Sequence, residues 1–255
     1  MNLCYSMKIH RQLKAFLPLL FSLAFVQLPA QVVEKIYKPY IATAQLYGYG
    51  NQQQLPVYRL NSTDRLQLEF DDMEGSLKNY YYAFVLCDYN WKQVNLNPFD
   101  YTKGFTQNRI ITYRYSSIAF TKYTHYQAVL PDRNSVPTRS GNYLLKVFLN
   151  GDTSKLVFTK RFFVVEKKES VAVQGMLPFG GSLFRTHQRL QIGVSTVSGQ
   201  INSFSPQDMK VVIVQNNIWP AATFLERPTV FRGNYFEYSD ENNTVFPAGK
   251  EWRWI

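Results

Sequence analysis

Short runs of apolar and aromatic residues, separated by turn-forming residues, follow one another along most of the chain. Residues 65–70 alternate polar and apolar side chains, which is the period-two pattern of a half-buried β-strand. Other runs are rich in Tyr, Phe, Val and Leu and indicate further strands. They cover residues 80–87, 110–115, 123–130, 143–149, 156–165, 171–173, 188–194, 209–214 and 235–238. Beyond the N-terminal segment no pattern is typical of a long amphipathic helix, so we predict an all-β fold.

The strongest turn signal is the Asn150-Gly151 step between two of these runs. An Asn-Gly step flanked by β-rich runs is typical of a hairpin, so residues 143–165 are predicted to form one. Many short strands at this spacing favour sandwiches, and Ser140-Gly141-Asn142-Tyr143 is typical of the penultimate strand of immunoglobulin-like domains. Turns and loops are predicted at residues 71–75, 95–104 and 131–141.

A charged break at residues 166–170 divides the strand pattern into two parts. We therefore predict two immunoglobulin-like β-sandwich domains, residues 31–168 and residues 169–255. Residues 251–255 begin an alternating strand that carries Trp252 and Trp254 and then stop. We expect the second sandwich to be incomplete, as in a fragment of a longer protein. The alternative is a terminal strand that pairs back into the second domain.

The N-terminus has the pattern of a secretory signal peptide, predicted at residues 1–30. Three cations precede an apolar run of 12 residues, 15–26, and Ala30 ends a cleavage-like region. A membrane anchor is the alternative, but a spanning helix needs about 20 apolar residues. Cleavage would remove three cations and no acid, lowering the net charge from +10 to +7. Basic charge suits nucleic acid, anionic lipid or an acidic protein surface, and export argues against nucleic acid.

Few residues suggest catalysis or metal binding. Cys87 ends an apolar strand and is therefore expected to be a buried, inert thiol. It has no disulfide partner in the mature chain, because Cys4 would leave with the signal peptide. His125 lies in a strand pattern, which favours a hydrogen-bonded structural role over a general base. Ser195 lacks the second glycine of a nucleophile elbow. Gly180-Gly181 is not a phosphate-binding loop, since no GK[ST] follows.

Two arrangements of carboxylates are candidate sites. Asp71, Asp72 and Glu74 are oxygen ligands that calcium could use, but a solvated turn is the preferred interpretation. Asp88 and Asp100 are a conceivable pair for glycoside cleavage, although the sequence does not fix their separation. We therefore predict no catalytic residue, no metal site, no cofactor and no small-molecule substrate.

Aromatic clusters leave two interpretations open. Successive strand residues point to opposite faces, so Tyr81 must lie on the face opposite to Tyr80 and Tyr82. Part of this set should reach the surface, where tyrosine suits protein recognition or sugar stacking. The other interpretation is a tyrosine-rich sandwich core. The remaining clusters are Tyr89-Asn90-Trp91 and Tyr113-Arg114-Tyr115.

An extended series of residues is similar to a known family. The series comprises Phe70-Asp71-Asp72, Tyr80-Tyr81-Tyr82, Cys87-Asp88, Trp91, Asn97-Pro98, Gly104-Phe105, Tyr123-Thr124-His125-Tyr126, residues 140–147, Arg161-Phe162, Val164-Val165-Glu166 and residues 246–253. From about residue 32 onward the chain resembles the plug protein of the type IX secretion system of Bacteroidota.

The resemblance implies a non-enzymatic periplasmic protein. Its partner would be the large outer-membrane translocon barrel, whose periplasmic opening it would seal while no substrate crosses. It would associate peripherally with the inner face of the outer membrane. Family members are longer than this chain, and no catalytic residue is carried over. Two other classes stay open from the residues: a carbohydrate-binding module, marked by an exposed coplanar aromatic platform, and an envelope hydrolase, marked by perturbed carboxylates in a pocket.

Overall fold

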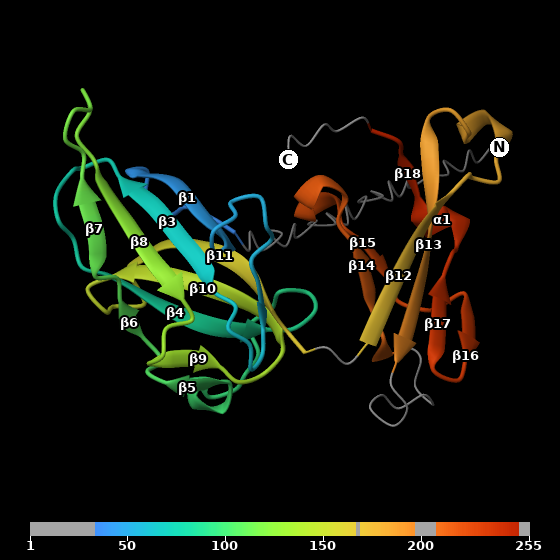
Figure 1. Cartoon of the computed structure of the whole chain (residues 1–255), viewed down its shortest axis with the longest axis horizontal. Coiled ribbons are helices and arrows are strands. Elements are labelled where there is room, and N and C mark those ends of the chain that lie inside the picture. The colour runs from blue at the N-terminus through green and yellow to red at the C-terminus, as the bar shows by residue number, and fades with distance from the viewer. Residues whose placement is uncertain (1–33, 167–168, 197–207, 250–255) are drawn as a thin grey trace, which may run out of the picture. The chain divides into compact units, whose positions relative to one another are not determined.

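The computed structural model describes residues 34–166, 169–196 and 208–249 (Figure 1). Strands make up most of the regular structure, and α1 (Glu241–Thr244) is a single turn of α-helix. No helix among the described residues is both long enough and apolar enough to span a bilayer. The predicted all-β fold is therefore confirmed. The predicted signal peptide and the final strand lie outside the described residues.

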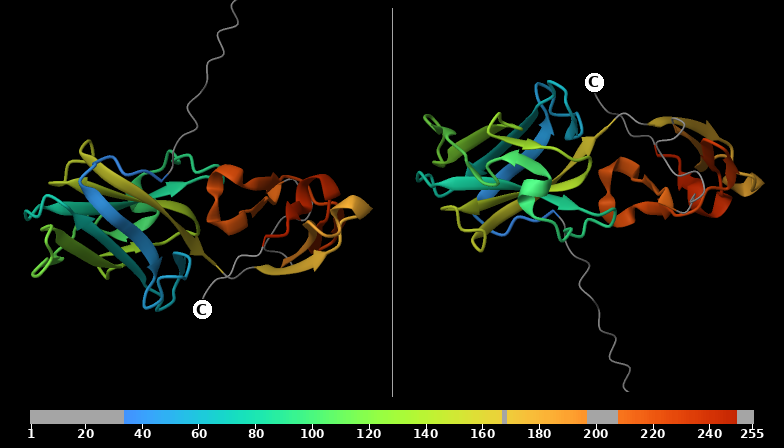
Figure 2. Two further views of the ribbon diagram at one scale, coloured as in Figure 1. Left: turned by 90° about the horizontal axis from the view of Figure 1, so that it is seen from above. Right: turned by 90° about the horizontal axis from the view of Figure 1, so that it is seen from below.

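Residues 34–166 form a sandwich of two sheets (Figures 1 and 2). The first sheet has the order β1-β3-β8-β7 and the second has the order β2-β11-β10-β4-β6. All neighbours are antiparallel except β2 and β11, which are parallel. Their bounds are β1 Ile41–Gly48, β2 Val57–Arg59, β3 Leu66–Asp72, β4 Tyr80–Cys87, β6 Asn108–Arg109, β7 Thr112–Tyr115, β8 Thr124–Leu130, β10 Gly141–Leu149 and β11 Leu156–Val165.

This strand order is that of the immunoglobulin fold. When the strands are lettered in chain order, the spatial order across the first sheet is A-B-E-D and across the second is A′-G-F-C-C′. Tyr143 lies near the start of the F-equivalent strand β10, and its hydroxyl donates to the carbonyl of Arg139 at 2.9 Å. This contact is the tyrosine corner of such domains. The sequence Ser140 to Tyr143 therefore indicated the right strand.

The core between the sheets follows from strand periodicity. Leu66, Leu68 and Phe70 alternate along β3 and are all at most 1 % exposed. Phe70 lies in contact with three other rings, at centroid distances of 5.0 Å from Tyr80, 5.1 Å from Tyr126 and 5.0 Å from Phe158. Edge-to-face and stacked aromatic pairs add to the stabilisation that burial alone supplies.

The predicted hairpin joins β10 to β11 through residues 150–155, and Asn150-Gly151 forms the first turn of this connection. Both residues have positive φ, 56° and 73°, and the amide of Asp152 donates to the carbonyl of Leu149 at 3.0 Å. Positive φ at both central residues is the geometry of the type I′ turn, which matches the twist of antiparallel strands. The hairpin prediction is confirmed, with β11 at the predicted residues 156–165.

Residues 169–249 repeat part of the same pattern. β12, β13, β17 and β16 form a sheet in that spatial order, again A-B-E-D. β18 pairs with residues 187–189 at the start of β13, whereas β17 pairs with residues 192–195 of the same strand. β14 and β15 form a separate two-stranded sheet. Their bounds are β12 Glu169–Met176, β13 His187–Thr196, β14 Val211–Ile213, β15 Thr223–Leu225, β16 Val230–Arg232, β17 Tyr235–Tyr238 and β18 Val245–Pro247. A small core of Ile192, Val194, Leu225, Phe236 and Tyr238 lies against this sheet.

Several expectations need correction. No strand was predicted before residue 65, yet β1 at Ile41–Gly48 pairs with β3. Asp71 and Asp72 were assigned to a turn but end β3, and Asp72 is fully buried. The predicted loop at residues 131–141 contains β9 (Ser135–Pro137), which pairs with β5 (Thr102–Gly104). Short strands of about three residues give too little periodicity to be predicted.

Candidate functional site

Among the described residues no group of three or more His, Cys, Asp and Glu side chains could hold a metal ion. The carboxylates considered for calcium are used in contacts within the protein. Asp72 Oδ2 accepts from Lys78 Nζ at 2.7 Å and from the Tyr80 hydroxyl at 2.8 Å, and Oδ1 accepts from the Glu74 amide at 3.0 Å. These contacts compensate the burial of the Asp72 charge.

The same network affects its partners. Burial lowers the pKa of Lys78, but the hydrogen bonds to Asp72 and Glu74 outweigh it and hold the pKa above its ordinary value. Burial, with the nearby Asp72 carboxylate, raises the pKa of Tyr80. Lys78 also lies over the ring of Tyr40, 4.0 Å from its centroid. The network is a structural anchor at the end of β3.

Asp71 and His125 form a second polar pair, on the outer face of the first sheet. His125 Nδ1 and Asp71 Oδ1 are 2.6 Å apart, and Thr43 Oγ1 donates to Asp71 Oδ2. His125 Nε2 lies 3.1 Å from Gln127 Nε2. His125 is thus held by neighbours on β3 and β8, as expected for a structural histidine, and no serine or cysteine lies among these contacts.

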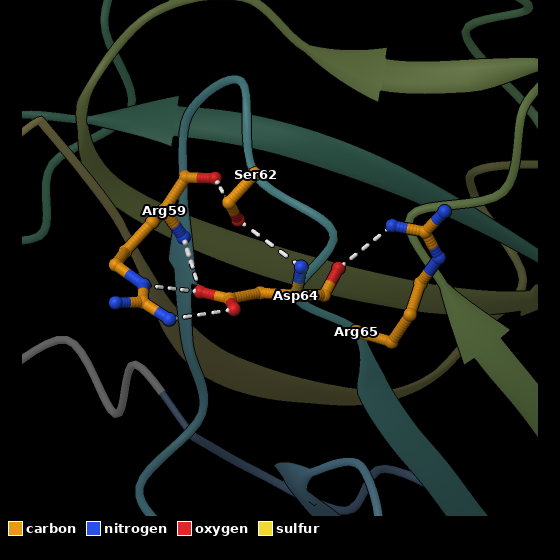
Figure 3. Close-up of polar contacts among 4 residues, drawn as sticks. All are labelled: Arg59, Ser62, Asp64 and Arg65. Atoms are coloured by element: carbon orange, nitrogen blue, oxygen red, sulfur yellow. Dashed lines mark hydrogen bonds and ion pairs between the residues drawn. The ribbon is translucent and has the colours of Figure 1, made fainter.

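A third polar cluster orders the loop that follows β2 (Figure 3). Arg59 holds Asp64 with two parallel bonds, Nε to Oδ2 at 2.7 Å and Nη2 to Oδ1 at 2.9 Å. The Ser62 hydroxyl donates to the Arg59 carbonyl at 2.7 Å and accepts from the Asp64 amide at 3.1 Å. The Arg59 guanidinium lowers the pKa of Asp64 to about 2. This carboxylate stays ionised and cannot serve as a general acid at neutral pH.

The remaining candidates are also placed in structural roles. Cys87 is buried, which raises the pKa of its thiol to about 11, and this fits an inert thiol. Asp88 Oδ1 accepts from the amides of Asn90 and Lys92, as in a turn cap. Ser195 lies within strand β13 rather than in an elbow. Gly181 begins a three-residue 3₁₀ turn, and the amides of Phe179 and Gly180 donate to Glu241 Oε1 at 2.9 and 3.4 Å.

The tyrosines divide between core and surface as strand alternation predicts. Tyr80 and Tyr82 are buried, whereas Tyr81 lies on the opposite face and stacks on Phe148. Tyr113 and Tyr115 are exposed on β7 and form a T-shaped pair with an interplanar angle of 76°. Both interpretations of the aromatic clusters are therefore partly right.

The most distinctive surface lies around β7. Between Asp100 and Asp132 the sequence holds Lys103, Arg109, Arg114 and Lys122 but no acidic residue. All four residues of β7 are exposed, and this strand is the edge of its sheet. The stretch without acidic residues is visible in the sequence. The strand predictions rested on apolar periodicity and turn residues, so they did not identify this basic surface.

The loop from Ser116 to Tyr123, here called the β7–β8 loop, projects beyond the ends of neighbouring strands at the upper left of Figure 1. The amide of Ser116 donates to the carbonyl of Tyr123 at 2.9 Å, and the Ser116 hydroxyl accepts from the Tyr123 amide at 2.9 Å. These bonds close the base of the loop. Its apolar tip, Ile118 and Phe120, therefore stands on an ordered hairpin.

These features define an immunoglobulin-like β-sandwich with an exposed, cation-bearing edge strand at β7. Residues 41–166, about half of the chain, match the family model described as "Type 9 secretion system plug protein 1st domain". Through this segment the chain belongs to the type 9 secretion system plug family. That family is a component of a secretion system and not a family of enzymes.

A solved structure is similar over more of the chain. It is a hypothetical protein from Parabacteroides merdae, with 25% sequence identity and a TM-score of 0.79. The match covers 86% of this chain, so it includes much of residues 169–249 as well as the plug segment. It covers 55% of the other chain, so this protein spans just over half the length of that structure. No curated protein matches the chain.

Proposed function

We propose that this protein is a plug subunit that binds the periplasmic side of the outer-membrane translocon of the type 9 secretion system and seals its channel. The observation that carries the proposal is the family match over residues 41–166. We also propose that residues 1–30 are a signal peptide and that residues 31–168 and 169–255 are its two domains. The protein would then lie in the periplasm against the inner face of the outer membrane.

A sandwich suits such a role for a physical reason. A channel wide enough for folded cargo leaks small solutes unless a rigid body occludes it. The first sandwich is built around fully buried aromatic rings, and tightly packed interiors deform little. Sealing needs shape and surface complementarity and requires no bond to be made or broken.

The carbohydrate-binding alternative finds less support. Sugar stacking calls for flat, coplanar, exposed rings, whereas the exposed pair Tyr113 and Tyr115 is nearly perpendicular. The ring that stacks parallel to Tyr81 is Phe148, which is buried. On the described part of the first sandwich, no two exposed rings are stacked on each other. Carbohydrate binding is one possible outcome of the deletion experiment described next.

The test is a deletion strain and a tagged version of the protein in the native host. Deletion is expected to increase sensitivity to large antibiotics that the outer membrane excludes, such as vancomycin, while secretion continues. The sensitivity should disappear when the translocon barrel is also deleted, because the leak passes through that barrel. The tagged protein should co-purify with the barrel from detergent-solubilised envelopes.

Two results would overturn the proposal. One is normal permeability in the deletion strain together with no co-purification of a large outer-membrane barrel. The other is normal permeability with impaired growth on a single glycan, which would favour the carbohydrate-binding module. Complementation with the wild-type gene is the control for both.

A further inference from the structure

The tip of the β7–β8 loop is the most exposed apolar feature of the described residues. Ile118 is 97% exposed and Phe120 is 107% exposed, more than any other large hydrophobic side chain there. Single exposed apolar residues are common on protein surfaces. Two almost fully exposed apolar side chains at the end of one ordered hairpin call for a partner that can bury them.

The shape of the tip restricts that partner. Ile118 and Phe120 stand on a projection, with Ser117, Ala119 and Thr121 as their exposed neighbours. A protein partner would need a pocket to receive such a projection. A lipid surface needs no preformed pocket, because its chains rearrange around an inserted side chain.

The charges around the tip are those that bind anions. Arg114 and Lys122 lie on either side of the tip, and neither forms an ion pair with any residue that the structure describes. The acids of the adjacent turns have partners of their own within the protein. Asp72 and Glu74 share Lys78, at 2.7 and 2.5 Å, and Asp152 lies 3.3 Å from Lys155. Arg114 and Lys122 are not held by these acids and can contact a lipid phosphate.

Tyrosines lie between the tip and the body of the sandwich. Tyr113 and Tyr115 are 38% and 57% exposed on β7, and their ring centroids are 5.5 Å apart. Tyrosine is enriched at the boundary between water and hydrocarbon, because its ring is apolar and its hydroxyl is polar. Tyrosines and cations thus alternate next to the apolar tip, as Tyr115, Arg114 and Tyr113 on the β7 side and as Lys122 and Tyr123 on the β8 side.

We propose that the β7–β8 loop docks the protein on an anionic phospholipid surface. Ile118 and Phe120 enter the boundary between headgroups and acyl chains, and Arg114 and Lys122 contact lipid phosphates. Long cationic side chains can bury their stems while their charges stay at the headgroups. Charge and apolar burial then act together, as in other peripheral anchors. This docking is independent of the proposed plug function.

The test is co-sedimentation of the purified protein with vesicles of phosphatidylglycerol and phosphatidylethanolamine. Binding is expected to fall by about tenfold or more in Ile118→Ser/Phe120→Ser, because both inserted side chains are lost. The matched control is Phe99→Ser, which removes a 69% exposed phenylalanine outside the loop and should bind as the wild type does. Circular dichroism should show all variants folded.

A second arm tests the charges. Lys122→Glu should weaken binding several-fold at low salt, whereas Lys103→Glu, outside the loop, should have a smaller effect. Vesicles of phosphatidylcholine alone should bind the wild type weakly, and salt should release the protein from anionic vesicles. Equal binding to both vesicle types would contradict the charge contribution.

The proposal fails if the wild type does not sediment with anionic vesicles, or if the serine double variant sediments equally well. It also fails if the double variant loses co-purification with the barrel in detergent while vesicle binding is absent, since the loop would then bind protein. In contrast, failure of the plug function would leave the vesicle result unchanged. The two proposals can therefore be separated.

Discussion

The two regions of the molecule share one sheet pattern and differ in what covers it. In both, four strands follow the order A-B-E-D. In residues 34–166 a five-stranded sheet covers that sheet, and 22 buried residues form the core. In the described part of residues 169–249 the covering sheet has two strands, and five buried residues form the core.

Strand pairing alone is not expected to make the two regions equally stable. Paired strands are present in both, but the hydrophobic contribution scales with the apolar area removed from water. β12 illustrates the contrast: it pairs with β13 over eight residues, yet Val171 and Val173 are 64% and 61% exposed. We expect the first region to carry most of the stability of the described chain.

The largest predicted effect comes from emptying each core. Phe70→Ala should lower the free energy of unfolding of the first region by about 4 kcal/mol, because a ring that contacts three others leaves a cavity. Phe236→Ala should cost about half as much, since its stacked neighbour Phe231 is 40% exposed and can move into the gap. Hydrogen exchange read by mass spectrometry reports each region separately. Equal losses would contradict the comparison.

A smaller effect is expected at two glycines, one in each region. Gly151 has a φ of 73°, so Gly151→Val should destabilise the first region by about 1 kcal/mol or more. Gly175 lies in β12 without positive φ, and a Cβ added there meets no atom within 4 Å. Gly175→Val should therefore leave the melting temperature unchanged or raise it slightly. Thermal unfolding followed by circular dichroism decides between these outcomes.

The smallest predicted effect concerns acid. The pKa of Asp64 is about 2 in the folded protein, against about 3.9 for an unperturbed Asp. Its stabilisation is present above about pH 4 and is lost as the pH falls toward 2. The loss should be small, because the Arg59 side chain is 68% exposed and screened by solvent.

Asp64→Asn is the variant that isolates this contribution. Between pH 4 and 2 the melting temperature of this variant should fall less than that of the wild type. High salt should reduce this difference between the two proteins. All ion pairs found among the described residues lie in the first region, so a fall in pH should destabilise the first region before the second. An identical pH profile for wild type and variant would show that Arg59 adds nothing.

The first region was largely predictable because its long strands carry strong local patterns. β4 and β11 begin and end at the predicted residues, and Asn150-Gly151 forms the predicted turn. β1 was missed because Ala42, Thr43 and Ala44 interrupt its apolar pattern, and a bulge shifts its register there. Local periodicity cannot reveal a strand whose identity depends on its partner.

The candidate site was less predictable than the fold. That Asp72 is buried depends on Lys78 and Tyr80 reaching the same point, which sequence spacing does not determine. The exposure of Ile118 and Phe120 depends on how far the hairpin extends past its neighbours. Apolar residues in a sequence suggest burial by default, and only the fold shows which of them remain in water.

The parallel pairing of β2 with β11 has a mechanical consequence. β2 is the second strand of the sandwich and β11 is the strand through which the chain leaves it. Three residue pairs join these two strands, from Phe163–Val57 to Val165–Arg59. When two parallel neighbours are pulled in opposite directions along their length, their hydrogen bonds are loaded together and must break together. Antiparallel ends pulled apart would open one bond at a time. The first sandwich is therefore built to resist tension applied between residues 57 and 165, and it should give way under load by a single abrupt rupture.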